Sequence, residues 1–165
     1  MRIYTKSGDK GETGLIGGQR VSKADMRITA ISEIDELNAV IGVLRSMKCY
    51  KKTDEILKQV QDDLFKIGAQ LADPQKKHTK IEITEQRTAA LEHFIDELEE
   101  KLPRLTNFIL PAGTPFAAEA HLTRAVCRRA ERSIVALHKK SPLPAEVLKY
   151  LNRLSDYLFL LAAGK

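Results

Sequence analysis

The chain has 165 residues, of which 43% are hydrophobic and 30% charged, a balance typical of a soluble globular protein and not of a disordered or fibrous one. Its 27 Lys and Arg residues exceed its 22 Asp and Glu residues, and this net charge of +5 permits an anionic partner such as a nucleotide. We find no apolar run long enough to span a membrane and no secretion signal, and the two distant cysteines exclude a disulfide scaffold. We therefore expect a single cytoplasmic domain over residues 1–165, without a membrane partner.

The first 24 residues form an N-terminal arm without helical periodicity. Within it, the segment Thr5–Gly14 holds three glycines, two lysines and three hydroxyl side chains. Glycine lets successive backbone N–H groups turn toward an anion, and hydroxyl and ammonium groups add donors that suit phosphate. The spacing matches neither the phosphate loop of nucleotide triphosphatases nor the dinucleotide fingerprint. Two interpretations stay open from these residues: a flexible tail or an anion-binding arm.

Residues 25–165 predict five amphipathic helices, because apolar residues recur at spacings of three and four. Thr53, Thr84 and Thr114 are the predicted N-caps of the second, third and fourth helices, and proline follows directly after Thr114. Two strand candidates, 2–5 and 80–84, are too short to build a sheet. The fold class predicted is all-α, a five-helix up-and-down bundle with a glycine-rich N-terminal arm. The predicted helices cover residues 25–47, 53–72, 84–102, 114–138 and 144–165.

The fourth helix carries an arginine stripe, which we define as Arg124, Arg128 and Arg132. Spacings of four residues place these guanidinium groups on one face, and Glu131 falls on the same face. The stripe is either a solvated face or a site for phosphate or carboxylate, which arginine binds in a forked geometry. Nucleic acid is not favoured as the ligand, because no aromatic residue lies between Arg124 and Arg132 to stack on bases.

Several sequence blocks together carry a resemblance to a known family. They are Tyr4–Thr13, Ile34–Asn38, Arg124–Arg132 and Tyr150–Asp156, with Phe108–Pro111 before the fourth helix. In this order, the blocks resemble the PduO-type ATP:cob(I)alamin adenosyltransferases over essentially the whole chain. The resemblance implies a homotrimer of ferritin-like five-helix bundles with an active site at each subunit interface, where Mg-ATP binds beneath the arm.

The resemblance also implies roles for individual residues. Arg128 would act on the triphosphate, Asp35 would pair with Arg128 across the bundle, and Phe108 would exclude the lower axial ligand from cobalt. The residues that would bind ATP are Thr5, Lys6, Ser7, Gly8, Thr13, Gly14, Lys23, Arg128, Arg129, Glu131, Arg132 and Asn152. Mg²⁺ would be held mainly by the ATP phosphates, without a dedicated protein site.

The implied reaction explains why the sequence offers no Ser-His-Asp triad and no zinc-like spacing. Reduced cobalamin is the nucleophile, so the protein has to position the reactants and neutralise charge on the leaving triphosphate. Ile31-Ser32 and Ala112 depart from the family pattern. The alternative to an active enzyme is therefore a catalytically degenerate module that binds or delivers ATP or cobalamin.

Overall fold

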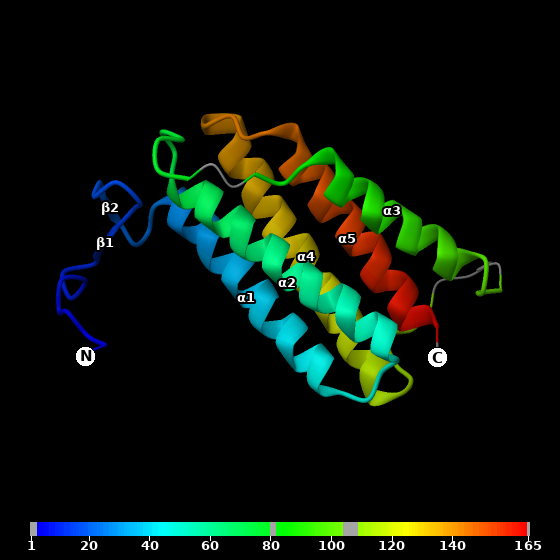
Figure 1. The fold of residues 1–165 in the computed structure, drawn as a ribbon. Helices are drawn as coiled ribbons and strands as arrows, with labels where there is room; N and C mark the ends of the chain where they lie inside the picture. The colour runs from blue at the N-terminus through cyan, green and yellow to red at the C-terminus, as the bar shows by residue number, and fades with distance from the viewer. Residues whose placement is uncertain (1–2, 80–81, 104–108, 165) are drawn as a thin grey trace.

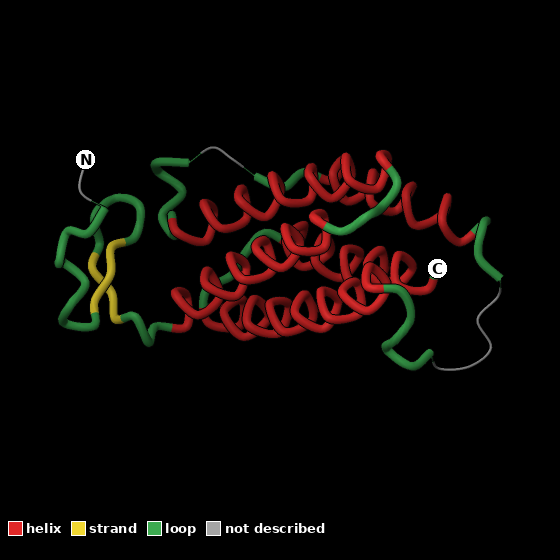
Figure 2. The backbone as a smooth tube through the Cα atoms, turned by 90° about the horizontal axis from the view of Figure 1, so that it is seen from below, coloured by secondary structure: helices red, strands yellow, loops and turns green. Residues whose placement is uncertain are grey.

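A computed structural model describes residues 3–79, 82–103 and 109–164 and contains five helices and a small hairpin (Figure 1). Successive helices run in opposite directions, so the predicted five-helix up-and-down bundle is confirmed. The hairpin lies beyond one end of the bundle in both Figure 1 and Figure 2. The elements are β1 (Glu12–Gly14), β2 (Arg20–Ser22), α1 (Met26–Ser46), α2 (Lys51–Ala72), α3 (Glu85–Glu99), α4 (Pro115–Lys140) and α5 (Ala145–Ala163).

The helix starts were predicted with mixed success. Thr114 caps α4 as expected, since its hydroxyl accepts a hydrogen bond from the backbone N–H of Ala117 at 3.2 Å. The Thr53 cap was wrong, because α2 already begins at Lys51 with Tyr50 as its cap residue. Thr84 does precede α3, although its side chain makes no capping hydrogen bond.

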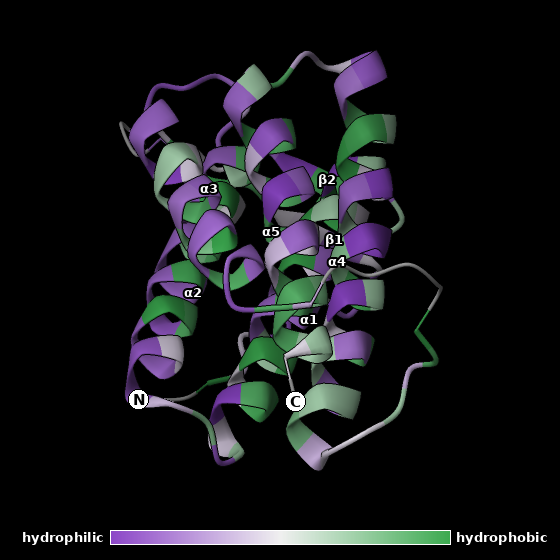
Figure 3. Cartoon of the chain, turned by 90° about the vertical axis from the view of Figure 1, so that its right-hand side faces the viewer, coloured by the Kyte–Doolittle hydropathy of each residue, from purple (hydrophilic) through white to green (hydrophobic). Residues whose placement is uncertain are grey.

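The helices pack in the spatial order α2–α1–α4–α5–α3 around an apolar core. Their outward faces are largely hydrophilic, and apolar residues gather between them (Figure 3). Burial of these side chains is the main favourable term in the stability of such a bundle. The core includes the fully buried residues Leu37, Ile41, Leu57, Leu64, Ile67, Ile134, Leu151 and Leu154.

A buried carboxylate joins α2, α3 and α5. Asp63 is fully buried and accepts hydrogen bonds from Arg87 at 2.6 Å and from the Tyr150 hydroxyl at 2.8 Å. Lys66 adds a further contact to Asp63 at 3.1 Å. The Asp63 hydrogen bond and the carboxylate charge raise the pKa of Arg87, which therefore stays charged. This network holds α3 against the rest of the bundle.

The arm contains a short hairpin that was not predicted from the sequence. Neither the described part of 2–5 nor that of 80–84 is a strand; instead, Thr13 pairs with Val21 in a two-stranded antiparallel hairpin within the arm. Residues 15–19 form its turn, closed by a hydrogen bond from Leu15 N–H to the Gln19 carbonyl at 2.8 Å. The arm is therefore a folded element in this structure and not a loose tail.

Candidate functional site

The first part of the candidate site is the turn that precedes the hairpin. Lys6 has φ of 61°, in the left-handed region that residues with side chains rarely adopt, and the Asp9 N–H closes the turn on the Lys6 carbonyl at 3.3 Å. The hydroxyls of Thr5 and Ser7 lie 2.7 Å apart. Arg20 donates to the Ser7 carbonyl at 2.7 Å, so β2 supports this turn. Hydroxyl, ammonium and backbone N–H donors in one turn form a set that suits phosphate oxygens.

Lys23 folds back onto this turn. Its backbone N–H donates to the Gly11 carbonyl at 2.8 Å, and its ammonium lies over Gly8, where a Cβ would be 3.2 Å from Nζ. The hairpin thus brings Lys23 to Gly8, and β1 carries Thr13 and Gly14 in the same small unit. All seven arm residues predicted to bind the nucleotide therefore belong to one folded segment.

The second part is the exposed seam between α4 and α5. The guanidinium of Arg124 lies 5.6 Å from the centre of the Phe159 ring, and the Cys127 thiol donates to the Leu151 carbonyl at 3.5 Å. These contacts set an antiparallel register, in which Arg128 and Glu131 of α4 and Asp156 of α5 all lie close enough to the Cys127 thiol to act on its charge. This side of α4 is therefore a row of charged groups beside polar groups of α5.

The seam residues differ in their exposure. Arg128, Arg132 and Asn152 are exposed, and Glu131 is partly buried. Beneath them, burial raises the pKa of the Cys127 thiol, which therefore stays protonated and is not a nucleophile. Exposed arginines are free to engage an anion, which fits a binding face as well as a solvated one.

Arg129 is the cation that crosses from α4 to α1. It forms an ion pair with Glu36 and lies 3.7 Å from Glu33, and the Glu36 hydrogen bond raises the pKa of Arg129. Its charge is therefore partly compensated within the chain, whereas no ion pair of Arg128 or Arg132 occurs among the described residues.

The predicted pair between Asp35 and Arg128 does not form across the bundle in the described chain. Asp35 lies instead in a surface depression between α1 and α2, beside Asn38 and Phe65. The reason is helical geometry: successive residues point about 100° apart, so Glu36 faces Arg129 while Asp35 faces α2. This part of the prediction is corrected, and Arg129 with Glu33 and Glu36 forms the ion pairs between α1 and α4.

A cavity of about 500 Å³ opens beside the seam, between α3 and α5. Its apolar walls are formed by Phe159, Leu160 and Leu102. On the α5 side, the acidic residue Asp156 also lines the cavity. Phe108, the residue predicted to face cobalt, lies outside the described residues, although the cavity wall reaches Pro103 on the same connection.

The arm and the arginine stripe do not meet within one chain. Figures 1 and 2 show the hairpin beyond the end of the bundle, whereas Arg128 lies midway along α4. Within the part of the chain that the structure describes, no cluster of three or more His, Cys, Asp or Glu side chains has the geometry to hold a metal ion. None of the described helices combines the length and hydrophobicity needed to cross a bilayer.

Comparison with known proteins identifies the family. Residues 3–164 match the family described as cobalamin adenosyltransferase. The chain belongs to this family. It is 41% identical to the corrinoid adenosyltransferase of Mycobacterium leprae and 42% identical to that of Bacillus subtilis, covering 98% of this chain in both cases and 89% and 85% of the relatives.

Solved structures agree with this membership. A variant of the PduO-type ATP:corrinoid adenosyltransferase from Lactobacillus reuteri, complexed with cobalamin and ATP, superposes with a TM-score of 0.93 at 39% identity, covering 98% of this chain and 92% of that chain. Another variant of the same enzyme, complexed with ATP, gives a TM-score of 0.91 at 39% identity, with 98% and 93% covered. The chain is thus an enzyme of the adenosyltransferase type, and the sequence-based recognition of the family is confirmed.

Sequence reasoning missed two contributors to the arm of this adenosyltransferase. Arg20 supports the Ser7 carbonyl, and His78 lies against the hairpin turn. A signal for the hairpin was present, since the pair Gly17-Gly18 separates two short β-prone segments around Thr13 and Val21. No sequence pattern indicated His78, because its place depends on how the connection after α2 folds.

Proposed function

We propose that this chain transfers the 5′-deoxyadenosyl group of ATP to the cobalt of cob(I)alamin, giving adenosylcobalamin and triphosphate. It does so in the cytoplasm as one catalytic domain, with residues 1–24 as the nucleotide-binding arm and 25–165 as the bundle. The observation that carries this proposal is the donor set of the arm, in which the Lys23 ammonium lies over Gly8 beside the hydroxyls of Thr5 and Ser7.

In this proposal the arm binds the polyphosphate of ATP. Lys6 takes a left-handed conformation in this turn, and the Lys23 ammonium supplies a positive charge over Gly8 in the same turn. Hydroxyl, ammonium and amide donors suit phosphate oxygens better than they suit a bare cation. Mg²⁺ therefore enters with ATP and, when bound, neutralises part of the phosphate charge. The arm residues assigned to ATP are Thr5, Lys6, Ser7, Gly8, Thr13, Gly14 and Lys23.

The α4 face serves the leaving group. As cobalt(I) attacks the 5′ carbon, a cobalt–carbon bond forms, the bond from that carbon to oxygen breaks, and its electron pair stays on the triphosphate. Arg128 and Arg132, together with Arg129, neutralise this charge, while Glu131 and Asn152 hold the ribose side. Preorganised cations are effective here because their positions are set by a rigid helix before the reaction begins.

The complete site lies between subunits of a homotrimer. Two features support this assembly: the arm extends beyond the end of its own bundle, and Arg128 and Arg132 are exposed without an ion pair in the described chain. An arm from one subunit on α4 of the next would unite the two halves. The corrinoid approaches from the cavity walled by Phe159, near the connection that carries Phe108.

The test is product formation from purified protein, ATP, Mg²⁺ and chemically reduced cobalamin. We expect adenosylcobalamin in the visible spectrum and one triphosphate released per turnover, with no diphosphate. ATP binding measured by calorimetry runs in parallel on the same preparation. Binding without product would contradict the enzyme and favour the alternative, a module that binds or delivers ATP or cobalamin.

The close approach of the Lys23 ammonium to Gly8 can be tested by substitution. Gly8→Ala introduces a methyl group 3.2 Å from the Lys23 Nζ, tighter than an ordinary contact, so the ammonium has to shift by a few tenths of an ångström from its place over Gly8. We expect the KM for ATP to rise about tenfold, as one charge-assisted hydrogen bond is worth about 1.5 kcal/mol, with thermal stability unchanged. Gly68→Ala in α2 is the control, since a methyl group there meets no atom within 4 Å. An unchanged KM in Gly8→Ala would remove Lys23 from the ATP site.

A further inference from the structure

The arm is attached to the bundle at its hairpin turn. Leu15 is 8% exposed, and the Ile16 N–H donates to the Ala72 carbonyl at the end of α2 at 2.9 Å. The other hydrogen bonds of the arm, as far as its residues are described, stay within the arm or at the start of α1. The turn therefore sets the direction in which the phosphate-binding part leaves the bundle.

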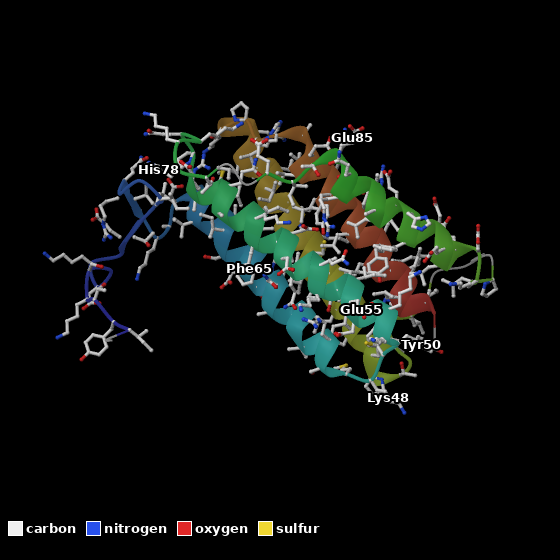
Figure 4. All side chains as sticks on the ribbon, viewed as in Figure 1. Lys48, Tyr50, Glu55, Phe65, His78 and Glu85 are labelled. Carbon is white, nitrogen blue, oxygen red and sulfur yellow. The ribbon has the colours of Figure 1, made fainter. Side chains whose placement is uncertain are left out.

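His78 lies directly against this turn (Figure 4). A Cβ placed on Gly17 would be 2.7 Å from Nε2 and 3.0 Å from Cδ2 of His78, so the imidazole occupies the space of a side chain. Gly17 also has φ of 92°, which only glycine adopts without strain. Both the conformation and the close approach therefore depend on glycine at this position.

The loop that carries His78 is itself held by a buried carboxylate. Asp73 is 1% exposed and accepts hydrogen bonds from the backbone N–H groups of His78 and Thr79, both at 2.7 Å, and of Lys77 at 3.4 Å. Burial acts to raise the pKa of Asp73, yet these N–H donors hold it below its ordinary value, so the carboxylate stays ionised. Asp73 thus fixes the backbone that presents His78.

We propose that His78 is a positioning residue: its ring, packed on Gly17 and held by the Asp73 loop, sets the direction of the arm and thereby the affinity for ATP. This inference rests on the proposed function of the arm. His78 packs against the hairpin turn and is not one of the arm donors assigned to phosphate. It therefore affects ATP binding only through the position of that turn.

Two neighbouring glycines provide a matched test. The backbone strain caused by alanine should be similar at the two positions, because the φ angles of Gly17 and Gly18 are 92° and 88°. Only the methyl group at position 17 would contact His78. We expect Gly17→Ala to raise the KM for ATP about tenfold above that of Gly18→Ala, with kcat at saturating ATP the same within about twofold. His78→Ala alone is expected to raise the KM to the level of Gly17→Ala, and the double variant should show no further increase, because both changes remove the same contact.

Amide hydrogen exchange of Ile16 in the ATP-free protein gives a second readout. Exchange is expected to be faster in Gly17→Ala and in His78→Ala than in Gly18→Ala, and no faster in the double variant than in Gly17→Ala, with the melting temperature of the bundle equal in all four. Because this measurement needs no ATP, it tests the contact even in a protein that forms no adenosylcobalamin. Equal Ile16 exchange in Gly17→Ala and Gly18→Ala, or a KM for ATP that His78→Ala leaves at the wild-type value, would overturn the proposal.

Discussion

Arg128→Ala is expected to lower kcat/KM for ATP and cob(I)alamin by at least ~100-fold. Removing one preorganised donor from a developing anion costs about 3 kcal/mol in the transition state. The fold should tolerate the change, because Arg128 is exposed and has no ion pair among the described residues. Lys139→Ala is the control, since it removes one exposed charge from the last turn of the same helix. Equal losses in both variants would mean that the effect comes from net charge alone.

Mixed assemblies extend this test to the subunit arrangement. An arm variant, Lys23→Ala, and Arg128→Ala each lack one half of the proposed site. If arm and α4 come from different subunits, co-assembly of the two inactive proteins should restore about a quarter of the wild-type activity, since a quarter of the contacts unite two intact halves. No recovery after demonstrated subunit exchange would place both halves in one chain.

Asp63→Ala is expected to have the largest effect on stability. It leaves the Arg87 guanidinium and the Tyr150 hydroxyl without their buried acceptor, and breaking a buried pair from one side costs about 3–5 kcal/mol. For a chain of this size, we expect the melting temperature to fall by about 10 °C or more.

The control for Asp63→Ala is Asp96→Ala, which removes an exposed acid from α3 and should change the free energy of unfolding by less than about 0.5 kcal/mol. Both values come from urea denaturation of the same preparations. If Asp63→Ala lowers the free energy of unfolding by less than about 1 kcal/mol, Arg87 and Tyr150 must bind water or other partners instead. The Asp63 network would then not be what holds α3 against the bundle.

The five helices could be predicted because burial follows the period of a helix. Ile34, Leu37 and Ile41 repeat at intervals of three and four, and all are at most 2% exposed. The same period does not account for Leu122, which lies four residues before the buried Val126 of α4 but is 54% exposed. Steps of four residues rotate by about 40° each, so Leu122 lies about 80° away from the buried Ala130.

The candidate site was predictable in its residue types but not in its contacts. Donor-rich glycine segments and an arginine stripe can be read from spacing, and the arm residues do fold together. Whether Asp35 or Glu36 faces α4 depends on how α1 is rotated in the bundle, which spacing alone does not determine. The hairpin strands have only three residues each, too few for an alternating pattern to identify.

The burial of Cys127 gives the protein a convenient property for spectroscopy. The only other cysteine, Cys49, is partly exposed in the turn between α1 and α2, at the end of the bundle away from the arm. A maleimide dye added to the native enzyme should therefore attach at one position without any cysteine having to be removed. Paired with a second fluorophore on the nucleotide, that dye would report the distance from the turn between α1 and α2 to the bound nucleotide during turnover.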